Sequence, residues 1–239
     1  MISTPTIQTL STKLQTTEQN VRREYVQHLF LSYFYQQPDA NHYLFKGGTA
    51  LRIVFNSPRF SEDLDFSAQI SDKNQLKNII LKTIREIERE GIGVKILEFK
   101  KTTGGYLASL NFQLGTEVIK ILLQYSKRTQ QNQSEATTIS SNFVPPYSIL
   151  ILERTSLIDE KIQALLARSK PRDFYDLYFL LRSNLITNEQ KQLLSKVKDK
   201  LASTQINFEL ELKQFLPKSH WLVIRNFKNN LMREIERFL

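Results

Sequence analysis

The sequence predicts an α+β fold, in which a small mixed β-sheet flanked by helices is followed by a helical C-terminal half. Three observations support this prediction. Short runs with strand-like alternation lie between positions 63 and 126, whereas apolar residues recur at helical spacing beyond position 150. The pair Pro145-Pro146 separates the two patterns. We therefore expect two domains, an α+β domain over residues 1–150 and a helical domain over residues 151–239.

Several segments of the first half have recognisable boundaries. Helical periodicity with suitable caps predicts a helix over 17–36 that ends before Pro38, and a strongly amphipathic helix over 73–90 that ends at Gly91. A short helix is expected over 49–56, stopped by Pro58. The predicted strands are 63–68, 94–101, 106–114 and 117–126. Residues 128–142 are polar and low in hydrophobicity, which predicts a loop.

The second half consists of amphipathic helical segments separated by polar or proline-containing joints. The expected helices cover residues 156–168, 172–183, 188–202, 207–216 and 219–239.

The composition restricts the class of protein. No run of about eighteen apolar residues occurs, so no membrane span is expected. The absence of cysteine excludes disulfides, thiolate nucleophiles and cysteine-based zinc sites, and we expect a cytoplasmic protein without a secretion signal. The net charge of +9 favours a polyanionic partner such as nucleic acid, a nucleotide or an acidic protein, although a scattered basic surface that only aids solubility would give the same value.

Two acids mark the first candidate site. Asp63 and Asp65 lie two residues apart in a predicted strand, so both should project from one face while Leu64 and Phe66 point to the core. Two adjacent carboxylates repel each other unless a cation lies between them, and Mg²⁺ (or Mn²⁺) is the usual ligand for such a pair together with phosphate oxygens. The alternative is a pair of solvated acids at a sheet edge.

A glycine pair lies shortly before these acids. Gly47 and Gly48 allow backbone N–H groups to approach a ligand, and they directly precede the predicted helix that begins at Thr49. This arrangement suits phosphate binding, with the Thr49 hydroxyl either capping the helix or contacting a phosphate. A plain turn before a capped helix is the alternative. Phosphate-binding groups and metal-binding acids within one short stretch together suit nucleotidyl transfer.

A second constellation lies at the junction of two predicted helices in the second half. Lys161 is on the first helix, and Arg172, Asp173 and Asp176 are on the second, which begins at Pro171. Lys161 is expected to act as a point charge on a triphosphate. The alternative is a salt-bridge network that only ties the helices together.

The segments "FKGGTALRIVF" and "RFSEDLDF" together resemble the AbiEii/AbiGii nucleotidyltransferase toxin family, which has a polymerase-β-like nucleotidyltransferase core. Gly47, Gly48, Asp63 and Asp65 match its first motif. Arg59 and Ser61 lie where the family often has an Arg and a Ser or Thr, and Lys161 and Asp176 match its later motifs.

The resemblance implies a metal-dependent nucleotidyltransferase that moves a nucleoside monophosphate from an NTP to an acceptor hydroxyl, with tRNA or another RNA as a candidate acceptor. It also implies that the chain is a toxin with a cognate antitoxin protein. The implied catalytic residues are Asp63, Asp65, Lys161 and Asp176, and the first two would hold the metal. The implied nucleotide-binding residues are Gly47, Gly48, Thr49, Ser61, Lys161 and Arg172.

One departure from the polymerase-β-like pattern concerns a third carboxylate, expected on a nearby strand. Leu122 stands at that position, Glu117 is too early, and Glu98 is on another strand. A weaker enzyme, a one-metal site or a shifted register would each account for this. The alternative functions are a catalytically weakened nucleotide- or RNA-binding module on the same fold, and a structural DNA- or partner-binding protein in which the acids only link helices.

Overall fold

The computed structural model describes residues 1–69, 72–127 and 133–239, and the chain divides into two compact units. The first unit comprises residues 1–56 and 60–153, and the second comprises residues 57–59 and 154–239. The short segment 57–59 thus groups with the C-terminal helices, although its neighbours in the chain on both sides belong to the first unit. We call the two parts the sheet unit and the helical unit.

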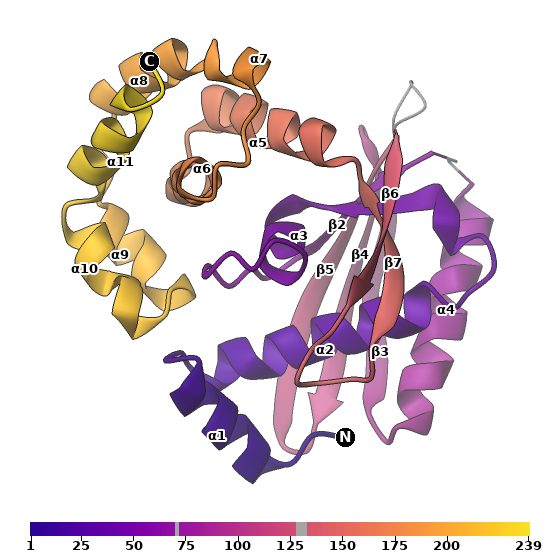
Figure 1. Ribbon diagram of the computed structural model, residues 1–239. Helices are drawn as coiled ribbons and strands as arrows, with labels where there is room; N and C mark the ends of the chain where they lie inside the picture. The colour runs from indigo at the N-terminus through magenta and orange to yellow at the C-terminus, as the bar shows by residue number, and fades with distance from the viewer. Residues whose placement is uncertain (70–71, 128–132) are drawn as a thin grey trace. The chain divides into compact units, whose positions relative to one another are not determined.

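A seven-stranded mixed sheet forms the centre of the sheet unit, with the strand order β3-β4-β5-β2-β1-β7-β6 (Figure 1). β2 is parallel to β5 and β1 is parallel to β7, while the remaining neighbours are antiparallel. The predicted fold class is confirmed. The strands are β1 (Tyr43–Lys46), β2 (Leu64–Ala68), β3 (Gly93–Thr102), β4 (Gly105–Leu114), β5 (Glu117–Lys127), β6 (Ser134–Ile139) and β7 (Tyr147–Leu152).

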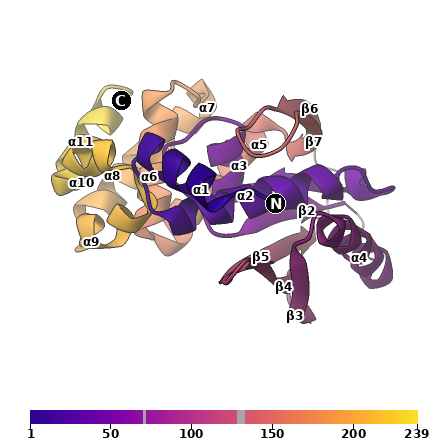
Figure 2. The same cartoon turned by 90° about the horizontal axis from the view of Figure 1, so that it is seen from below.

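One face of this sheet is covered by helix α2, as Figures 1 and 2 show from two directions. Phe34 of α2 meets the rings of Phe66 and Tyr125 with centroid distances of 5.2 and 6.4 Å. Phe66 and Tyr125 themselves stack at 4.8 Å, so aromatic rings from α2, β2 and β5 form one buried layer. The helices of the sheet unit are α1 (Thr4–Lys13), α2 (Glu18–Phe34), α3 (Gly47–Ile53) and α4 (Lys73–Arg89).

Helix α4 begins and ends where its sequence predicts. The Asp72 carboxylate accepts hydrogen bonds from the main-chain N–H groups of Asn74 and Gln75 at 2.8 and 3.1 Å, which caps the first turn. Gly91 adopts a φ of +78° directly after the helix, a conformation that glycine reaches without steric cost. The buried apolar residues recur at helical spacing: Leu76, Ile79, Ile80, Ile84 and Ile87.

The opposite face of the sheet has a different character. Because side chains alternate along a strand, every second residue of β2 to β5 points away from α2. These residues are mostly polar, and most are half-buried or exposed. We call this surface the polar sheet face; its members other than glycine are Asp65, Ser67, Lys95, Glu98, Lys100, Thr102, Leu107, Ser109, Asn111, Gln113, Val118, Lys120, Leu122, Gln124 and Ser126.

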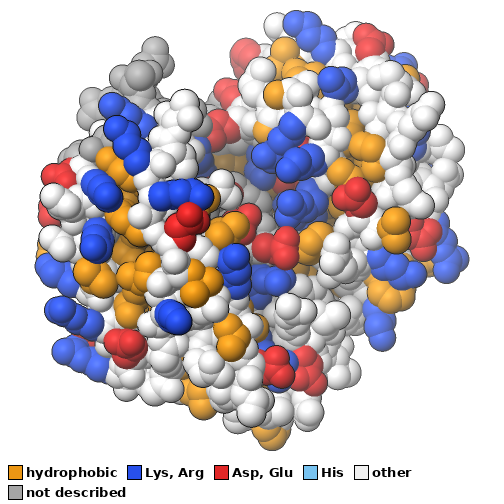
Figure 3. All heavy atoms as spheres, turned by 180° about the vertical axis from the view of Figure 1, so that it is seen from behind, with side chains coloured by type: hydrophobic (Ala, Val, Ile, Leu, Met, Phe, Trp, Pro, Cys, Tyr) orange, Lys and Arg blue, Asp and Glu red, His pale blue; other side chains and the backbone are white. Residues whose placement is uncertain are grey.

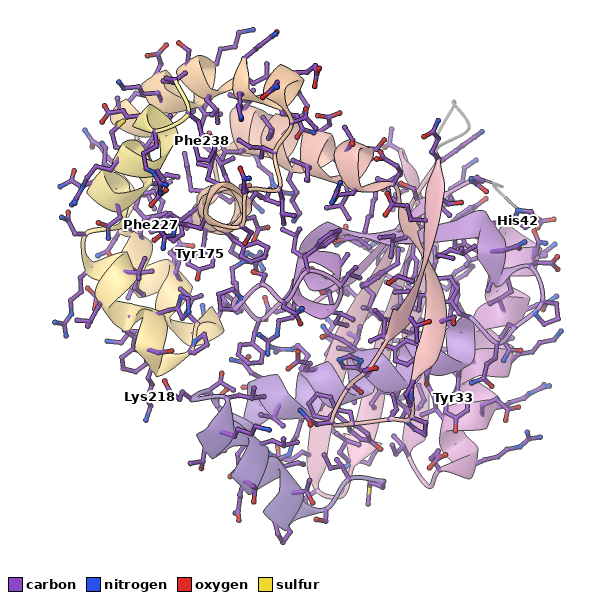
Figure 4. All side chains as sticks on the ribbon, in the orientation of Figure 1. Tyr33, His42, Tyr175, Lys218, Phe227 and Phe238 are labelled. Atoms are coloured by element: carbon purple, nitrogen blue, oxygen red, sulfur yellow. The ribbon has the colours of Figure 1, made fainter. Side chains whose placement is uncertain are left out.

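The helical unit has its own core. α6 packs against α5, α9 and α11. Tyr175 of α6 stacks on Phe227 of α11 at 5.8 Å, and Figure 4 shows both side chains directed into this unit. Its helices are α5 (Arg154–Arg168), α6 (Pro171–Arg182), α7 (Asn188–Lys191), α8 (Leu194–Ala202), α9 (Phe208–Leu212), α10 (Trp221–Arg225) and α11 (Phe227–Glu236).

Some boundaries differ from the predictions. The loop predicted over 128–142 contains β6, an edge strand whose exposed position explains its polar composition; residues 128–132 lie outside the described part of the chain. The segments predicted as single helices over 188–202 and 219–239 are each divided in two. In the second case Asn226 leaves the helical conformation, with φ −121° and ψ 40°.

Within the described ranges, the helices are all too short or too polar to cross a membrane.

Candidate functional site

The acid pair lies at the start of β2. Leu64 and Phe66 are fully buried, whereas Asp63 and Asp65 are half-buried, as the alternation predicts. Asp63 directly precedes the strand, and Asp65 lies opposite Lys46 in the antiparallel β1–β2 ladder. The core residues on either side therefore fix the direction in which the Asp65 carboxylate points.

Gly47 lies directly against the Asp65 side chain. Its φ is +86°, and a Cβ at this position would lie 2.8 Å from both Cβ and Cγ of Asp65, a separation that real Cβ atoms do not reach. Gly47 is also the first residue of α3, and the buried Gly48 follows it. The first turn of α3 thus begins in contact with a carboxylate, and only glycine fits there.

Thr49 connects α3 to the other acid. Its hydroxyl donates a hydrogen bond to the main-chain oxygen of Asp63, and its side chain is completely buried. The sequence suggested a helix cap or a phosphate contact, but this hydroxyl proton is used to hold Asp63 in place. Upstream of the acids, the side-chain amide of Gln27 donates to the main-chain oxygen of Ser61 at 3.0 Å. The segment before β2 is therefore held from α2 and from α3.

The strand pairing confirms that Leu122 lies on the face where a third carboxylate was expected. Asp65 pairs with Gln124 in the parallel β2–β5 ladder, so Gln124 and Leu122 share the face of Asp65. Glu117 points to the other face. Glu98 does lie on the polar sheet face, but it is two strands away from β5, roughly 10 Å, and it pairs with Lys100 at 2.8 Å.

A cluster of three or more His, Cys, Asp or Glu side chains that could hold a metal ion does not occur among the described residues. Asp63 and Asp65 therefore contribute two carboxylates and are not part of a larger acidic cluster within the described residues. Such a pair suits a cation that completes its coordination with substrate phosphates and water.

Lys161 and Asp176 meet in the helical unit, as parts of a buried ionic triad with Arg59. Arg59 binds the Asp176 carboxylate through two nitrogens at 2.7 and 3.0 Å, and Lys161 Nζ approaches Oδ2 at 2.8 Å. Asp176 is 1% exposed. Burial raises the pKa of its carboxyl, but the charges of Arg59 and Lys161 lower the pKa by more, so it lies below its ordinary value of 3.8.

The neighbouring residues of this junction have other partners. Asp173 accepts two hydrogen bonds from Arg168 at 2.7 and 2.8 Å and a third from the Lys170 main chain, which caps α6. The guanidinium of Arg172 lies over the Phe215 ring, 5.4 Å from its centroid. The salt-bridge alternative thus describes Asp173 well.

The predicted site residues therefore fall into two groups. Gly47, Gly48 and Thr49 lie with Asp63 and Asp65 in the sheet unit, whereas Lys161, Arg172 and Asp176 belong to the helical unit. That both groups line one cleft stays a prediction. Sequence reasoning noted Arg59 only as a motif position and missed its pairing with Asp176, since an ion pair between residues so distant in the chain leaves no local pattern.

A further buried ion pair anchors α3. Arg52 binds Glu24 of α2 at 2.7 and 3.2 Å and also lies over the Phe60 ring at 4.0 Å. His28, one turn after Glu24 on α2, bonds through Nδ1 to the Tyr147 hydroxyl at 2.8 Å. Burial, with a smaller contribution from Arg52, lowers the pKa of His28 to about 3. His28 is therefore a neutral core residue.

The sequence profile described as "Nucleotidyl transferase AbiEii toxin, Type IV TA system" matches residues 29–237. Among solved structures, the chain is similar to MenT4, a nucleotidyltransferase toxin from Mycobacterium tuberculosis H37Rv, with a TM-score of 0.69, 16% identity and coverage of 100% of this chain and 90% of the other. It is also similar to JHP933 from Helicobacter pylori, with a TM-score of 0.62, 22% identity and coverage of 93% and 95%. No curated protein matches the chain.

Proposed function

Since the chain belongs to the AbiEii nucleotidyltransferase toxin family of type IV toxin–antitoxin systems, we propose that it transfers a nucleoside monophosphate from an NTP to an acceptor hydroxyl. We propose further that the reaction requires Mg²⁺ (or Mn²⁺) and that the acceptor is an RNA, with tRNA as the first candidate. Family membership implies a cognate antitoxin, and growth inhibition by this chain is the expected biological result.

The observation that carries this proposal is the contact between Gly47 and Asp65. The first turn of a helix presents main-chain N–H groups that have no acceptor within the helix, and here that turn begins beside a carboxylate. Phosphates bound by the N–H groups of Gly47 and Gly48 would be repelled by Asp65 unless a cation lay between them. The arrangement is therefore most useful for a ligand that brings phosphates and a divalent metal together.

Asp63 and Asp65 fit such a metal. Mg²⁺ binds proteins through one or two carboxylates and completes its shell with phosphate oxygens and water, which matches a half-buried pair whose neighbours on the same face of β5, Leu122 and Gln124, carry no carboxylate. Bound there, the metal would offset the negative charge that develops on the transferring phosphate. Thr49 keeps Asp63 in position through its bond to the main chain.

We assign the remaining residues supporting roles. Lys161 is 13% exposed, and we propose that its ammonium neutralises the triphosphate, with Ser61 and Arg172 as further nucleotide contacts. Asp176 accepts hydrogen bonds on both oxygens from Arg59 and Lys161, so we propose that it positions this lysine rather than acting as a base. Arg59 precedes Asp63 by only four residues in the chain, which supports a common role for the two groups.

A radiolabel assay tests the transferase directly. Purified protein is incubated with α-³²P-labelled NTPs, Mg²⁺ and total tRNA, and we expect label on the RNA with wild type and none with Asp63→Ala. The same substitution should relieve growth inhibition when the chain is expressed without its antitoxin.

The alternative is a weakened nucleotide- or RNA-binding module, which the residues Leu122 and Gln124 favour because neither supplies a carboxylate beside Asp65. Tight Mg-NTP binding without transfer to any RNA would support it. A structural DNA- or partner-binding protein would instead show no Mg²⁺-dependent thermal stabilisation by NTP, and Asp65→Asn would then leave the response of the melting temperature to Mg-NTP unchanged.

A further inference from the structure

We propose that the polar sheet face binds the acceptor RNA strand, which would run from Asp65 across β5, β4 and β3. This inference rests on the proposed nucleotidyl transfer and assigns it an acceptor surface. The N–H groups of Gly47 and Gly48 lie on the β1–α3 side of Asp65 and are assigned to the triphosphate. The strands on the other side of Asp65 are left for the acceptor.

Strand pairing places the members of this face in rows. Asp65 pairs with Gln124, Gln124 with Leu107, and Leu107 with Lys100. Neighbouring strands lie about 4.8 Å apart, so this row extends roughly 14 Å from the acid pair. The row formed by Lys120, Asn111 and Lys95 lies four residues further along the strands, about 13 Å away. The face is therefore wide enough for a short extended segment of RNA.

Three polar groups on this face, those of Ser67, Ser109 and Asn111, have no hydrogen-bond partner among the described residues. The Ser109 group is the hydroxyl of a residue that is 3% exposed, and the Asn111 group is the side-chain oxygen. Both lie on the central strand β4, where Ser109 pairs with Leu122 and Asn111 pairs with Lys120. Buried polar groups are normally satisfied, so these two point to a ligand that offers donors as well as acceptors.

Positive charge flanks Asn111, whereas Ser109 lies between Leu122 and Glu98. Lys95 and Lys120 flank Asn111 on its two neighbouring strands, and both are exposed. The other charged pair on β3, Lys100 with Glu98, is internally neutral. Figure 3, viewed from behind Figure 1, shows Lys and Arg side chains interspersed with hydrophobic ones over the sheet unit.

This combination favours RNA over an acidic protein. Lysines bind phosphates of either nucleic acid, whereas the 2′-hydroxyl and the base edges of unpaired RNA supply both donors and acceptors for Ser109 and Asn111. A carboxylate-rich segment would satisfy the lysines but would offer the Asn111 oxygen only main-chain donors.

The test compares two double variants with the same change in charge. Lys95→Gln/Lys120→Gln removes lysines from the polar sheet face. Lys101→Gln/Lys127→Gln is the control, because it removes exposed lysines from the same two strands, β3 and β5, but on the other face of the sheet. Lys101 pairs there with Tyr106, and Lys127 pairs with Ala68. The probe is a short fluorescein-labelled single-stranded RNA of mixed sequence, and its affinity is measured by anisotropy across a salt series.

We expect the first double variant to bind RNA about tenfold more weakly at low salt, with the slope of log K against log salt reduced by about 1.4 for two lost phosphate contacts. The second double variant should bind as wild type does. Thermal stabilisation by Mg-NTP should be unchanged in both, because neither pair belongs to the nucleotide site.

A third variant separates a binding role from a structural one. Ser109→Ala removes a buried hydroxyl that has no partner in the described structure, so its stability should equal or exceed that of wild type while its RNA affinity falls. A variant with unchanged RNA affinity would contradict the assignment of Ser109.

Three results would overturn the proposal: equal weakening in both double variants, no RNA binding by wild type, or displacement of the RNA by polyglutamate as effective as that by unlabelled RNA. The last result would assign this face to an acidic protein. Because Mg-NTP stabilisation is measured separately, failure of the RNA surface would be distinguishable from failure of the nucleotide site.

Discussion

Asp176→Asn is the substitution whose effect follows most directly from the structure. The change keeps the size of the side chain but removes the charge that Arg59 and Lys161 share. Arg59 is 3% exposed, so its guanidinium would remain buried after losing the charge of Asp176. Breaking a buried ion pair by removing one partner costs about 3–5 kcal/mol of unfolding free energy.

An exposed ion pair of the same helical unit provides the control. Lys198 and Glu236 are 2.9 Å apart, but their side chains are 39% and 49% exposed. Lys198→Gln should therefore cost no more than about 1 kcal/mol.

The assay uses the single tryptophan of the chain. Trp221 belongs to the helical unit, as does the triad, so its fluorescence during urea unfolding reports on the part that Asp176→Asn perturbs. A cost in this variant no greater than that of Lys198→Gln would refute the reasoning about the triad. Replacing all three members by apolar residues should restore stability without restoring nucleotide transfer.

The difference in unfolding free energy between wild type and Asp176→Asn should also depend on pH, which gives a second check. The folded pKa of Asp176 lies below its unfolded value, so at low pH the unfolded state binds more protons than the folded state. The stabilisation is fully present above the unfolded pKa of 3.8 and is lost as pH falls through the lower folded pKa. The gap between wild type and Asp176→Asn should thus stay constant from neutral pH to about 5 and shrink below about 4.

The remaining predictions concern the sheet unit. Gly47→Ala should abolish transfer and Mg-NTP stabilisation, because its Cβ would overlap Asp65; Gly91→Ala has a similar positive φ but nothing within 4 Å, so it should keep activity and lose only modest stability. The pKa of His28 is 6.5 in the unfolded state and about 3 in the folded state, so only the unfolded state binds the proton between these values. As pH is lowered from 6.5 to 3, the free energy of unfolding of wild type should therefore fall by about 1.4 kcal/mol per pH unit relative to His28→Gln, measured by urea unfolding. Leu122→Asp adds a carboxylate on the face of Asp65, and we expect a higher apparent affinity for Mg²⁺ in the transfer assay.

Strong local patterns made parts of this fold predictable. The α4 helix has a cap, an apolar stripe and a terminal glycine within one segment, and each signal specified the same boundaries. The edge strand β6 was missed because its polar sequence suits solvent exposure, and only its pairing with β7 makes it a strand. Local composition cannot show that pairing.

In the candidate site, too, local patterns predicted some features and tertiary contacts determine the others. The alternation of this segment predicted that Asp65 projects away from the core between the buried Leu64 and Phe66, because strand alternation is a local rule. Two other contacts join residues that are distant in the chain. Thr49 and the Asp63 main chain are separated by 14 positions, and Arg59 and Asp176 by 117, so no local motif specifies either contact. The sequence thus indicated which residues are chemically able to act, but not the partners that position them.

Transfer of α-³²P label from NTP to total tRNA by wild type, Asp65→Asn and Asp39→Asn tests the central claim most directly. Asp39 is exposed and has a φ of +67°, which asparagine tolerates, so it provides a matched control. We predict transfer by wild type and Asp39→Asn that stops when EDTA is added, and a loss of at least about a hundredfold in Asp65→Asn. Undiminished labelling of RNA by Asp65→Asn would contradict the assignment of the glycine–aspartate contact as the catalytic centre.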